Sequence, residues 1–272
     1  MPHTPPLAPT SPAQAKRRQW IAGAVALVVV ATIALGLKAA RGSEVDPAPT
    51  TAVATTEPTA PTSEPTTSTS STTAAPSPTT RTRPTYRSTG QYRSVVQDSP
   101  VRGRATGQLV TYRVEVEQGS GVSPRKFAQA VDTTLRHRRG WTAGGHWRFQ
   151  RVTTGAPDVT IRVATPDTVD KHCEAAGAST RGYSSCRAGG YIMLNLDRWE
   201  LGVPHVKSLS AYRHYLINHE MGHALGKGHE RCPRKGKPAP VMVQQTHGLQ
   251  GCTANAWPRS VSGRLITGPP AP

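Results

Sequence analysis

Five residues between positions 219 and 229 have the types and spacing of a metal site that could do catalysis. His219 and His223 are four positions apart, so on a helix their imidazoles lie on the same face, one turn apart. Histidine nitrogens bind zinc at about 2.0–2.1 Å. Glu220 lies one step round the helix, where its carboxylate can reach a metal-bound water without binding the metal itself. These residues therefore predict metal-assisted hydrolysis with Glu220 as general base.

Two histidines do not hold a catalytic zinc ion, and the sequence offers a third beyond the end of this helix. Gly226 follows His223 by three positions, and glycine readily adopts the left-handed conformation that ends a helix and turns the chain. His229 comes three positions later and is predicted to return to the metal as the third nitrogen ligand. The fourth coordination position then stays open for water, as is typical of catalytic rather than structural zinc sites.

This spacing resembles the signature of the metzincin clan of zinc peptidases, which reads here His219-Glu220-x-x-His223-x-x-Gly226-x-x-His229. The resemblance implies that the three histidines bind Zn²⁺, that Glu220 is the general base, and that a methionine-containing turn lies beneath the metal. Met242, thirteen residues after His229, is the candidate for that turn. Glu230 extends the signature as in the astacin-like branch of the clan.

Two positions depart from the astacin-like pattern. Lys227 stands where astacins carry a bulky residue after the glycine. No tyrosine follows Met242, where that branch supplies a further metal ligand, and Gln244 and Gln245 stand there instead. The resemblance therefore extends to the clan and not to the astacin family.

Residues 20–37 have the length and composition of a membrane-spanning helix. They contain no charged side chain, and as a helix they would be roughly 27 Å long, enough to cross the core of a bilayer. The basic residues Lys16–Arg18 precede them, which places residues 1–19 in the cytoplasm and the rest of the chain outside the cell. A cleaved signal peptide is the alternative, but residues 37–40 are a poor cleavage site. We therefore predict a single-pass anchor.

A stalk is predicted between the anchor and the folded domain, over residues 38–88. Residues 47–80 are nearly all Thr, Pro, Ser and Ala, and such a composition buries too little apolar surface to fold. Residues 89–272 form the predicted domain, which is long enough to bury a core. This order of anchor, stalk and basic domain is similar to that of an uncharacterised family of actinobacterial surface proteins, a likeness that implies no substrate.

The predicted domain is strongly basic. The chain has a net charge of +17, and after residue 80 there are 28 Lys and Arg against 12 Asp and Glu. Such charge favours anionic partners, here an anionic cell-wall polymer or a lipid surface beside the peptide or protein substrate. The basic residues are not interleaved with aromatic residues as in single-strand binders, so nucleic acid is not expected. The oligomeric state is not indicated.

The four cysteines are expected to form disulfides. None of them stand in a Cys-x-x-Cys pair, which argues against a structural zinc knuckle. Four cysteines allow three connectivities, of which we predict the two sequence-local pairs, Cys173–Cys186 and Cys232–Cys252. The second pair would hold the loop that follows His229. Disulfides require an oxidising compartment, in agreement with an extracellular domain.

The elements that must position the histidines indicate an α+β fold. Residues 111–117 alternate between apolar and polar side chains, as in a half-buried strand. Ser123 and Pro124 are typical of a helix start, and that helix is expected to end near Gly140. Further strands are predicted at 147–152, 158–163 and 191–196, and a helix carrying the histidines at 209–225. With the metzincin resemblance, this predicts a zincin-like twisted mixed sheet packed on the two helices.

The function predicted from the sequence is zinc-dependent hydrolysis of peptide bonds outside the membrane. In zincin folds an edge strand of the sheet pairs with an extended substrate, and the strand at 191–196 is the candidate for that role. The alternative for this strand is an ordinary core strand. Two alternatives remain open: a non-catalytic basic surface module in which zinc is structural or vestigial, and a zinc amidase that acts on peptidoglycan.

Overall fold

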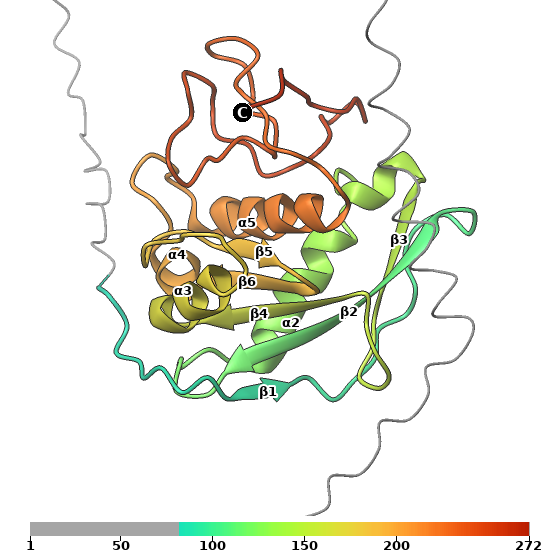
Figure 1. Ribbon diagram of the computed structural model, residues 1–272. Helices are drawn as coiled ribbons and strands as arrows, with labels where there is room; N and C mark the ends of the chain where they lie inside the picture. Colours follow the sequence, from blue (N-terminus) through green and yellow to red (C-terminus); the bar gives the residue numbers. More distant parts are fainter. Residues whose placement is uncertain (1–81, 272) are drawn as a thin grey trace, which may run out of the picture. The chain divides into compact units, whose positions relative to one another are not determined.

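The computed structural model describes residues 82–271, and this part of the chain forms an α+β domain on one twisted mixed sheet (Figure 1). The predicted α+β class is therefore confirmed. The predicted anchor at residues 20–37 and nearly all of the predicted stalk lie outside the described residues. Between residues 82 and 271, no helix is long and apolar enough to cross a membrane.

Six strands make up the sheet of this part of the chain, four of them parallel to one another. The order across the sheet is β1 (Tyr92–Ser94), β2 (Gln108–Glu117), β4 (Val159–Ala164), β6 (Tyr191–Asn195) and β5 (Cys186–Ala188), with β3 (Trp147–Arg151) beside β2. β3 pairs with the first half of β2, and β1 pairs antiparallel with its second half. At the other end of the sheet, β5 pairs antiparallel with β6.

One strand prediction needs correction. The strand at 191–196 exists as β6, but it lies inside the sheet between β4 and β5 and is not the edge strand. The edge is β5, which was not predicted because three residues are too few to show an alternating pattern. The same shortness explains why β1 was missed.

Two helices cover one face of the sheet, and both begin where the sequence predicts. α2 (Pro124–Leu135) starts after Ser123, whose hydroxyl accepts a hydrogen bond from the amide of Lys126. It ends before the predicted Gly140. α5 (Leu209–Ala224) starts after Ser208, whose hydroxyl accepts from the amide of Ala211. The short helices α3 (Pro166–Glu174), α4 (Leu196–Leu201) and η1 (Trp141–Gly144) were not predicted.

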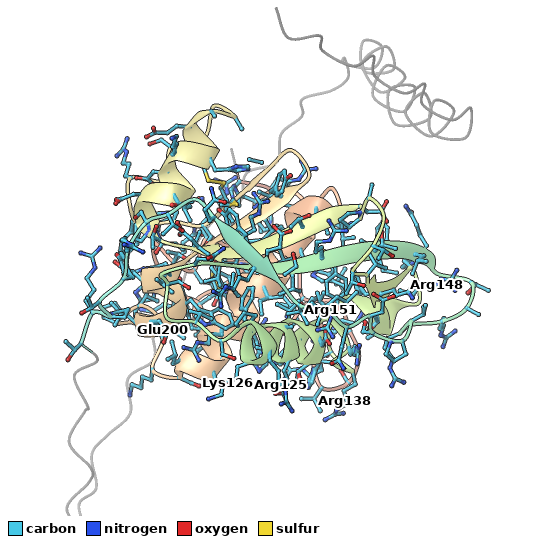
Figure 2. The ribbon with its side chains drawn as sticks, turned by 90° about the horizontal axis from the view of Figure 1, so that it is seen from below. Arg125, Lys126, Arg138, Arg148, Arg151 and Glu200 are labelled. Atoms are coloured by element: carbon cyan, nitrogen blue, oxygen red, sulfur yellow. A yellow bond between two sulfur atoms is a disulfide. The ribbon has the colours of Figure 1, made fainter. Side chains whose placement is uncertain are left out.

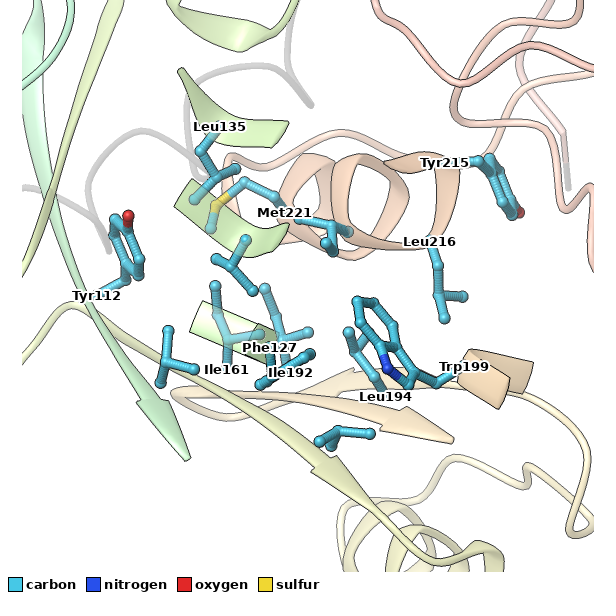
Figure 3. Close-up of a cluster of buried hydrophobic side chains, with 14 of the residues drawn as sticks. Tyr112, Phe127, Leu135, Ile161, Ile192, Leu194, Trp199, Tyr215, Leu216 and Met221 are labelled. Carbon is cyan, nitrogen blue, oxygen red and sulfur yellow. The ribbon is translucent and has the colours of Figure 1, made fainter. Parts of the chain in front are cut away.

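The main core lies between α2, α5 and the sheet. Successive strand residues point to opposite faces, so Ile192 and Leu194 of β6 belong to this core, whereas Met193 packs with Cys173 and Ala188 beneath α3. Figure 3 shows side chains of α2, α5 and the sheet meeting there, among them Phe127, Leu135, Ile161, Ile192, Leu194, Leu216 and Met221.

Helix α5 is enclosed on both sides, which matters for the site. Irregular chain after residue 225 covers the side of α5 that faces away from the sheet (Figure 1). Residues on several sides of the helix are therefore buried, including Tyr212, Tyr215 and Ile217. Because of this double cover, α5 lacks the one-sided apolar stripe of a surface helix.

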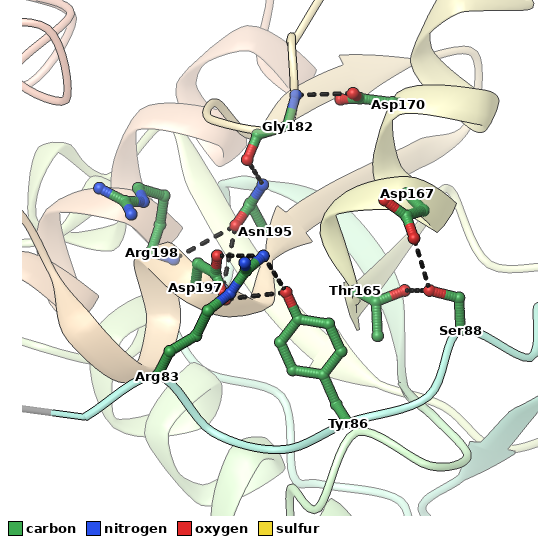
Figure 4. Close-up of polar contacts among 10 residues, drawn as sticks. All are labelled: Arg83, Tyr86, Ser88, Thr165, Asp167, Asp170, Gly182, Asn195, Asp197 and Arg198. Carbon is green, nitrogen blue, oxygen red and sulfur yellow. Dashed lines mark hydrogen bonds and ion pairs between the residues drawn. The ribbon is translucent and has the colours of Figure 1, made fainter.

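Residues before the predicted boundary at Thr89 already contact the domain. Arg83 forms an ion pair with Asp197 at 3.0 Å, and the hydroxyl of Tyr86 donates to the same carboxylate at 3.1 Å. Ser88 donates to Asp167 at 3.2 Å. These contacts hold residues that the sequence assigns to the stalk against the domain (Figure 4). Their partners lie about 80 to 110 positions away in the chain, so local composition could not reveal them.

Candidate metal centre

Two of the predicted ligands are oriented by main-chain carbonyl groups. Nδ1 of His219 lies 2.8 Å from the carbonyl oxygen of Val241, and Nδ1 of His223 lies 2.8 Å from that of Lys227. A carbonyl oxygen only accepts hydrogen bonds, so both Nδ1 atoms carry the proton. The Nε2 lone pairs are then free to bind a cation, the arrangement usual for metal-binding histidines.

The third histidine is returned to this point by the end of α5. Gly226 has a φ of 79°, and the amide of Lys227 donates to the carbonyl of Gly222 at 2.9 Å. A second bond runs from the amide of Gly226 to the carbonyl of His223 at 3.1 Å. This is a Schellman ending, which satisfies the last carbonyls of the helix and reverses the chain.

The three imidazoles meet at one point. Nε2 of His223 lies 3.3 Å from Nε2 of His219 and 3.1 Å from Nε2 of His229. The ligand atoms of all three lie within 4.8 Å of one another. Bonds of 2.0–2.1 Å at tetrahedral angles would separate two nitrogens by about 3.3 Å. Two of the three separations thus have the length expected between nitrogen ligands of one zinc ion.

All three histidines favour the neutral form that a metal requires. Burial, with a smaller contribution from His223, lowers the pKa of His219 to about 3. Burial also lowers the pKa values of His223 and His229. The charge of Arg187, which lines the same cleft as the histidines, further lowers the pKa of His223.

Glu220 is buried beside the histidines, with 4% of its surface exposed. Its Oε2 has no hydrogen-bond partner among the described residues, and burial raises the pKa of the carboxyl to about 8. The side chain lines the same cleft as the three histidines. Burying a carboxylate oxygen without a hydrogen-bond partner costs folding free energy. This oxygen can therefore accept a hydrogen bond from a donor that enters the cleft.

The predicted methionine turn lies against both ligand-bearing segments. The amide of Val243 donates to the carbonyl of Pro240 at 3.0 Å and closes the turn around Met242. Within it, the Val241 carbonyl accepts from His219. The Met242 carbonyl accepts from the amide of Glu230, next to His229, at 3.1 Å. This one turn therefore fixes the relative position of the first and third histidines.

Gly222 is a residue of the site that the sequence analysis missed. It lies inside α5 between the first two histidines, and a Cβ there would collide with the sulfur of Met242 and lie 3.0 Å from the indole of Trp141. A glycine in a helix interior is destabilising on propensity alone. A glycine inside a predicted helix was therefore the feature of the sequence that could have pointed to a close contact at this position.

The site opens into a cleft of about 420 Å³. One wall is the segment of residues 178–187, which ends in β5, and another is formed by residues 244–247. Gln244 is exposed to the cleft, whereas Gln245 is buried and donates to and accepts from the main chain of Asn255. The cleft is lined largely by polar side chains: Ser179, Thr180, Ser184, Ser185, Arg187, Gln244, Thr246 and His247 beside the catalytic candidates.

The cleft wall 178–187 is held rigidly from behind. Asp170 of α3 accepts hydrogen bonds from Thr180 and from the amide of Gly182. The side-chain amide of Asn195 donates to the Gly182 carbonyl at 3.1 Å (Figure 4). The disulfide Cys173–Cys186 ties the end of the segment to α3.

Both predicted disulfides are confirmed. Cys173–Cys186 joins α3 to β5, and Cys232–Cys252 brackets the chain that contains the methionine turn. Cys232 follows His229 by three positions, so this second bridge closes the loop that directly follows the third predicted ligand.

Four other histidines of the domain, His172, His205, His214 and His247, have partners of their own. His205 donates to the carbonyl of Gln245 at 2.6 Å, and His214 lies 2.8 Å from the hydroxyl of Thr134. His172 packs edge-on against Tyr191. These three are hydrogen-bonded or packed residues, whereas His247 lines the cleft and lies 2.9 Å from the hydroxyl of Ser184. The position of His247 in the sequence matches no metal-ligand spacing, so the sequence could not predict that it lies in the cleft.

Comparison with known proteins assigns a family but no activity. No curated protein matches the chain. A family profile matches residues 79–258, more than half of the 272 residues, and this range includes the whole sheet, the three histidines and both disulfides. On that match, the chain belongs to the family described as "Protein of unknown function (DUF3152)".

Proposed function

We propose that the domain is a zinc-dependent, metzincin-like peptidase in which His219, His223 and His229 hold the metal and Glu220 is the general base. The observation that carries the proposal is the convergence of three Nε2 atoms beside a buried carboxylate oxygen without a partner. The cleft in front of them has the size of a small-ligand or peptide subsite.

The chemistry would divide between the metal and Glu220. A zinc ion, when bound, supplies Lewis-acid activation of a water molecule and of the scissile carbonyl. Glu220 accepts the proton of the attacking water and passes it to the leaving amine. The low exposure of Glu220 keeps bulk water from competing for this proton. The edge strand β5 offers main-chain groups to an extended peptide beside the cleft.

The test is metal analysis and peptide-library cleavage with the full-length chain and its Glu220→Gln variant. We expect one zinc per chain in both proteins. Cleavage should fall by about 10² to 10⁴ in the variant, the usual contribution of a general base, and should stop when the parent protein is treated with a chelator. Glu200→Gln is the matched control, because Glu200 pairs with Arg213 at the surface and not with the site. Parent-like rates in Glu220→Gln would refute the proposal.

The same experiment addresses the amidase alternative. A peptidoglycan substrate would be hydrolysed with the same dependence on zinc and Glu220, whereas the peptide library would remain uncut. Extracellular placement by an anchor at residues 20–37 is part of the proposal, and protease accessibility of the domain on intact cells tests it.

A second candidate function, binding of an anionic polymer or lipid surface, is favoured by one observation. Arg125, Lys126 and Arg138 are exposed on and just after α2 (Figure 2). The only acidic residue of α2, Asp132, is already paired with Arg151 at 3.0 Å. Such binding should weaken steeply with ionic strength and should be unaffected by a chelator, unlike hydrolysis.

A further inference from the structure

Arg187 occupies the middle of β5, the strand that ends the sheet beside the metal centre. Its neighbours Cys186 and Ala188 are buried, and Arg187 itself is exposed and lines the cleft. Side chains alternate between the two faces of a strand. Cys186 and Ala188 pack on the side of α3, so Arg187 points to the opposite side, towards the cleft. The Cys173–Cys186 bridge fixes this register next to Arg187.

Among the residues that the structure describes, none supplies a counter-charge to the guanidinium of Arg187. Within residues 82–271, no carboxylate forms an ion pair with it. Beside the histidines, the charged side chains lining the described cleft are Arg187 and Glu220. The carboxylate of Glu220 is buried next to the metal ligands and is committed to the site. The open part of the cleft is therefore positive and is lined by hydroxyl and amide groups rather than apolar side chains.

We infer that Arg187 binds a carboxylate of the substrate close to the scissile bond, so that the domain selects peptides that carry a carboxylate there. This inference rests on the proposed peptidase function. A peptide laid along β5 brings alternate side chains towards the cleft, and a carboxylate there would meet the planar donor fork of Arg187. The carboxylate can belong to an Asp or Glu side chain or to the free C-terminus of a peptide.

The experiment uses a peptide of about eight residues taken from the library substrates, with both ends blocked. At each position beside the cut, Glu is compared with Gln and Lys. A parallel set of peptides has Gln at each of these positions and a free C-terminus in place of the blocked one. For the full-length protein we expect the Glu peptide at one position to exceed its Gln counterpart in kcat/KM by about fivefold, the scale of a partly exposed ion pair. A free-C-terminus preference of the same size would assign the carboxylate to the chain end.

The variants are Arg187→Gln and Arg187→Glu. The Glu-to-Gln ratio should fall to about one in the first, and the second should favour the Lys peptide, since the pair is electrostatic. Arg93→Glu is the matched control: Arg93 is the exposed middle residue of the opposite three-residue edge strand, β1, and this variant should keep the parent ratio. Zinc content and thermal midpoint verify that each variant is folded.

Binding provides the second readout and separates this inference from the proposed function. Affinity of the Glu and Gln peptides is measured with the Glu220→Gln protein, with and without the Arg187→Gln change. An Arg187-dependent preference without any hydrolysis would support the inference while the peptidase proposal fails. Hydrolysis with no preference for either carboxylate, or a preference that survives both Arg187 variants, would overturn the inference alone.

Discussion

Gly222 lies against the side chain of Met242 so closely that one added methyl group would collide with the sulfur. The contact joins α5, which carries two of the histidines, to the turn whose carbonyls bond His219 and the residue after His229. The indole of Trp141 lies beside the same spot and donates to the carbonyl of Asn218 at 3.0 Å. The absence of a side chain at Gly222 thus sets the distance between helix and turn.

Gly222→Ala should destabilise the domain, although alanine is the better helix former. Relief of the glycine penalty would stabilise a free helix by about 1 kcal/mol, whereas overpacking a buried contact costs about 1–3 kcal/mol. We expect a net loss in the free energy of unfolding by denaturant, together with weaker zinc retention. Combining the change with Met242→Ala should cost less than the sum of the two single changes. A variant as stable as the parent would show that the helix and turn separate freely.

Zinc should stabilise the folded domain through the three histidines. A ligand that binds only the native state at about 1,000 times its Kd adds about 4 kcal/mol of stability. We expect a chelator to lower the thermal midpoint of the parent protein and to leave that of His229→Ala unchanged. His172→Gln is the control, since His172 packs against Tyr191 away from the ligand cluster. Equal chelator effects on the parent and His229→Ala would remove His229 from the ligand set.

The two disulfides should have different effects on metal binding. Cys232→Ser with Cys252→Ser opens a loop of 20 positions around the methionine turn, a cross-link worth about 3 kcal/mol. Zinc affinity should fall because the freed loop contains the turn whose carbonyls accept hydrogen bonds from His219 and from Glu230, the residue after His229. The double change of Cys173 and Cys186 to Ser is the control, because that bridge, spanning 13 positions, ties α3 to β5 instead. Equal zinc affinity in the two variants, measured by competition with a chromophoric chelator, would contradict this role.

Glu117 should make the domain sensitive to acid. Its side chain is 1% exposed and accepts hydrogen bonds at 2.7–2.8 Å from the amides of Thr89, Gly90 and Thr165 and the hydroxyl of Thr168. Burial opposes ionisation, but these four bonds outweigh it and lower the pKa below the ordinary 4.5. The ionised form is thus favoured by folding.

The corresponding stability is present above the ordinary carboxyl pKa and is lost as the pH falls through the lowered folded pKa. Glu117→Gln should therefore cost about 1–3 kcal/mol near neutral pH, because the amide cannot accept all four bonds. It should also flatten the decline of stability between neutral and acidic pH. Denaturant unfolding at several pH values measures both effects, and parallel pH profiles for variant and parent would exclude Glu117 as the source.

The sequence alone determined the features that depend on neighbours in the chain. The i, i+4 spacing puts His219 and His223 on one helix face, and Gly226 ends the helix by a left-handed turn whatever lies around it. Ser123 and Ser208 cap α2 and α5 with their own side chains. The disulfide pairs are also local, and both were predicted correctly.

Tertiary structure decided the features that join distant segments. The strand at 191–196 was predicted, but only the packing of β5 beside it shows that it is internal and that Arg187 faces the cleft. The fit of Gly222 to Met242 joins residues that are 20 positions apart in the chain. The ion pair of Arg83 with Asp197 joins residues that are more than 100 positions apart. Spacing and caps act through backbone geometry within one or two turns, and so can be read along the chain. Pairing at a sheet edge and contact between side chains depend on how whole elements pack, which no local pattern contains.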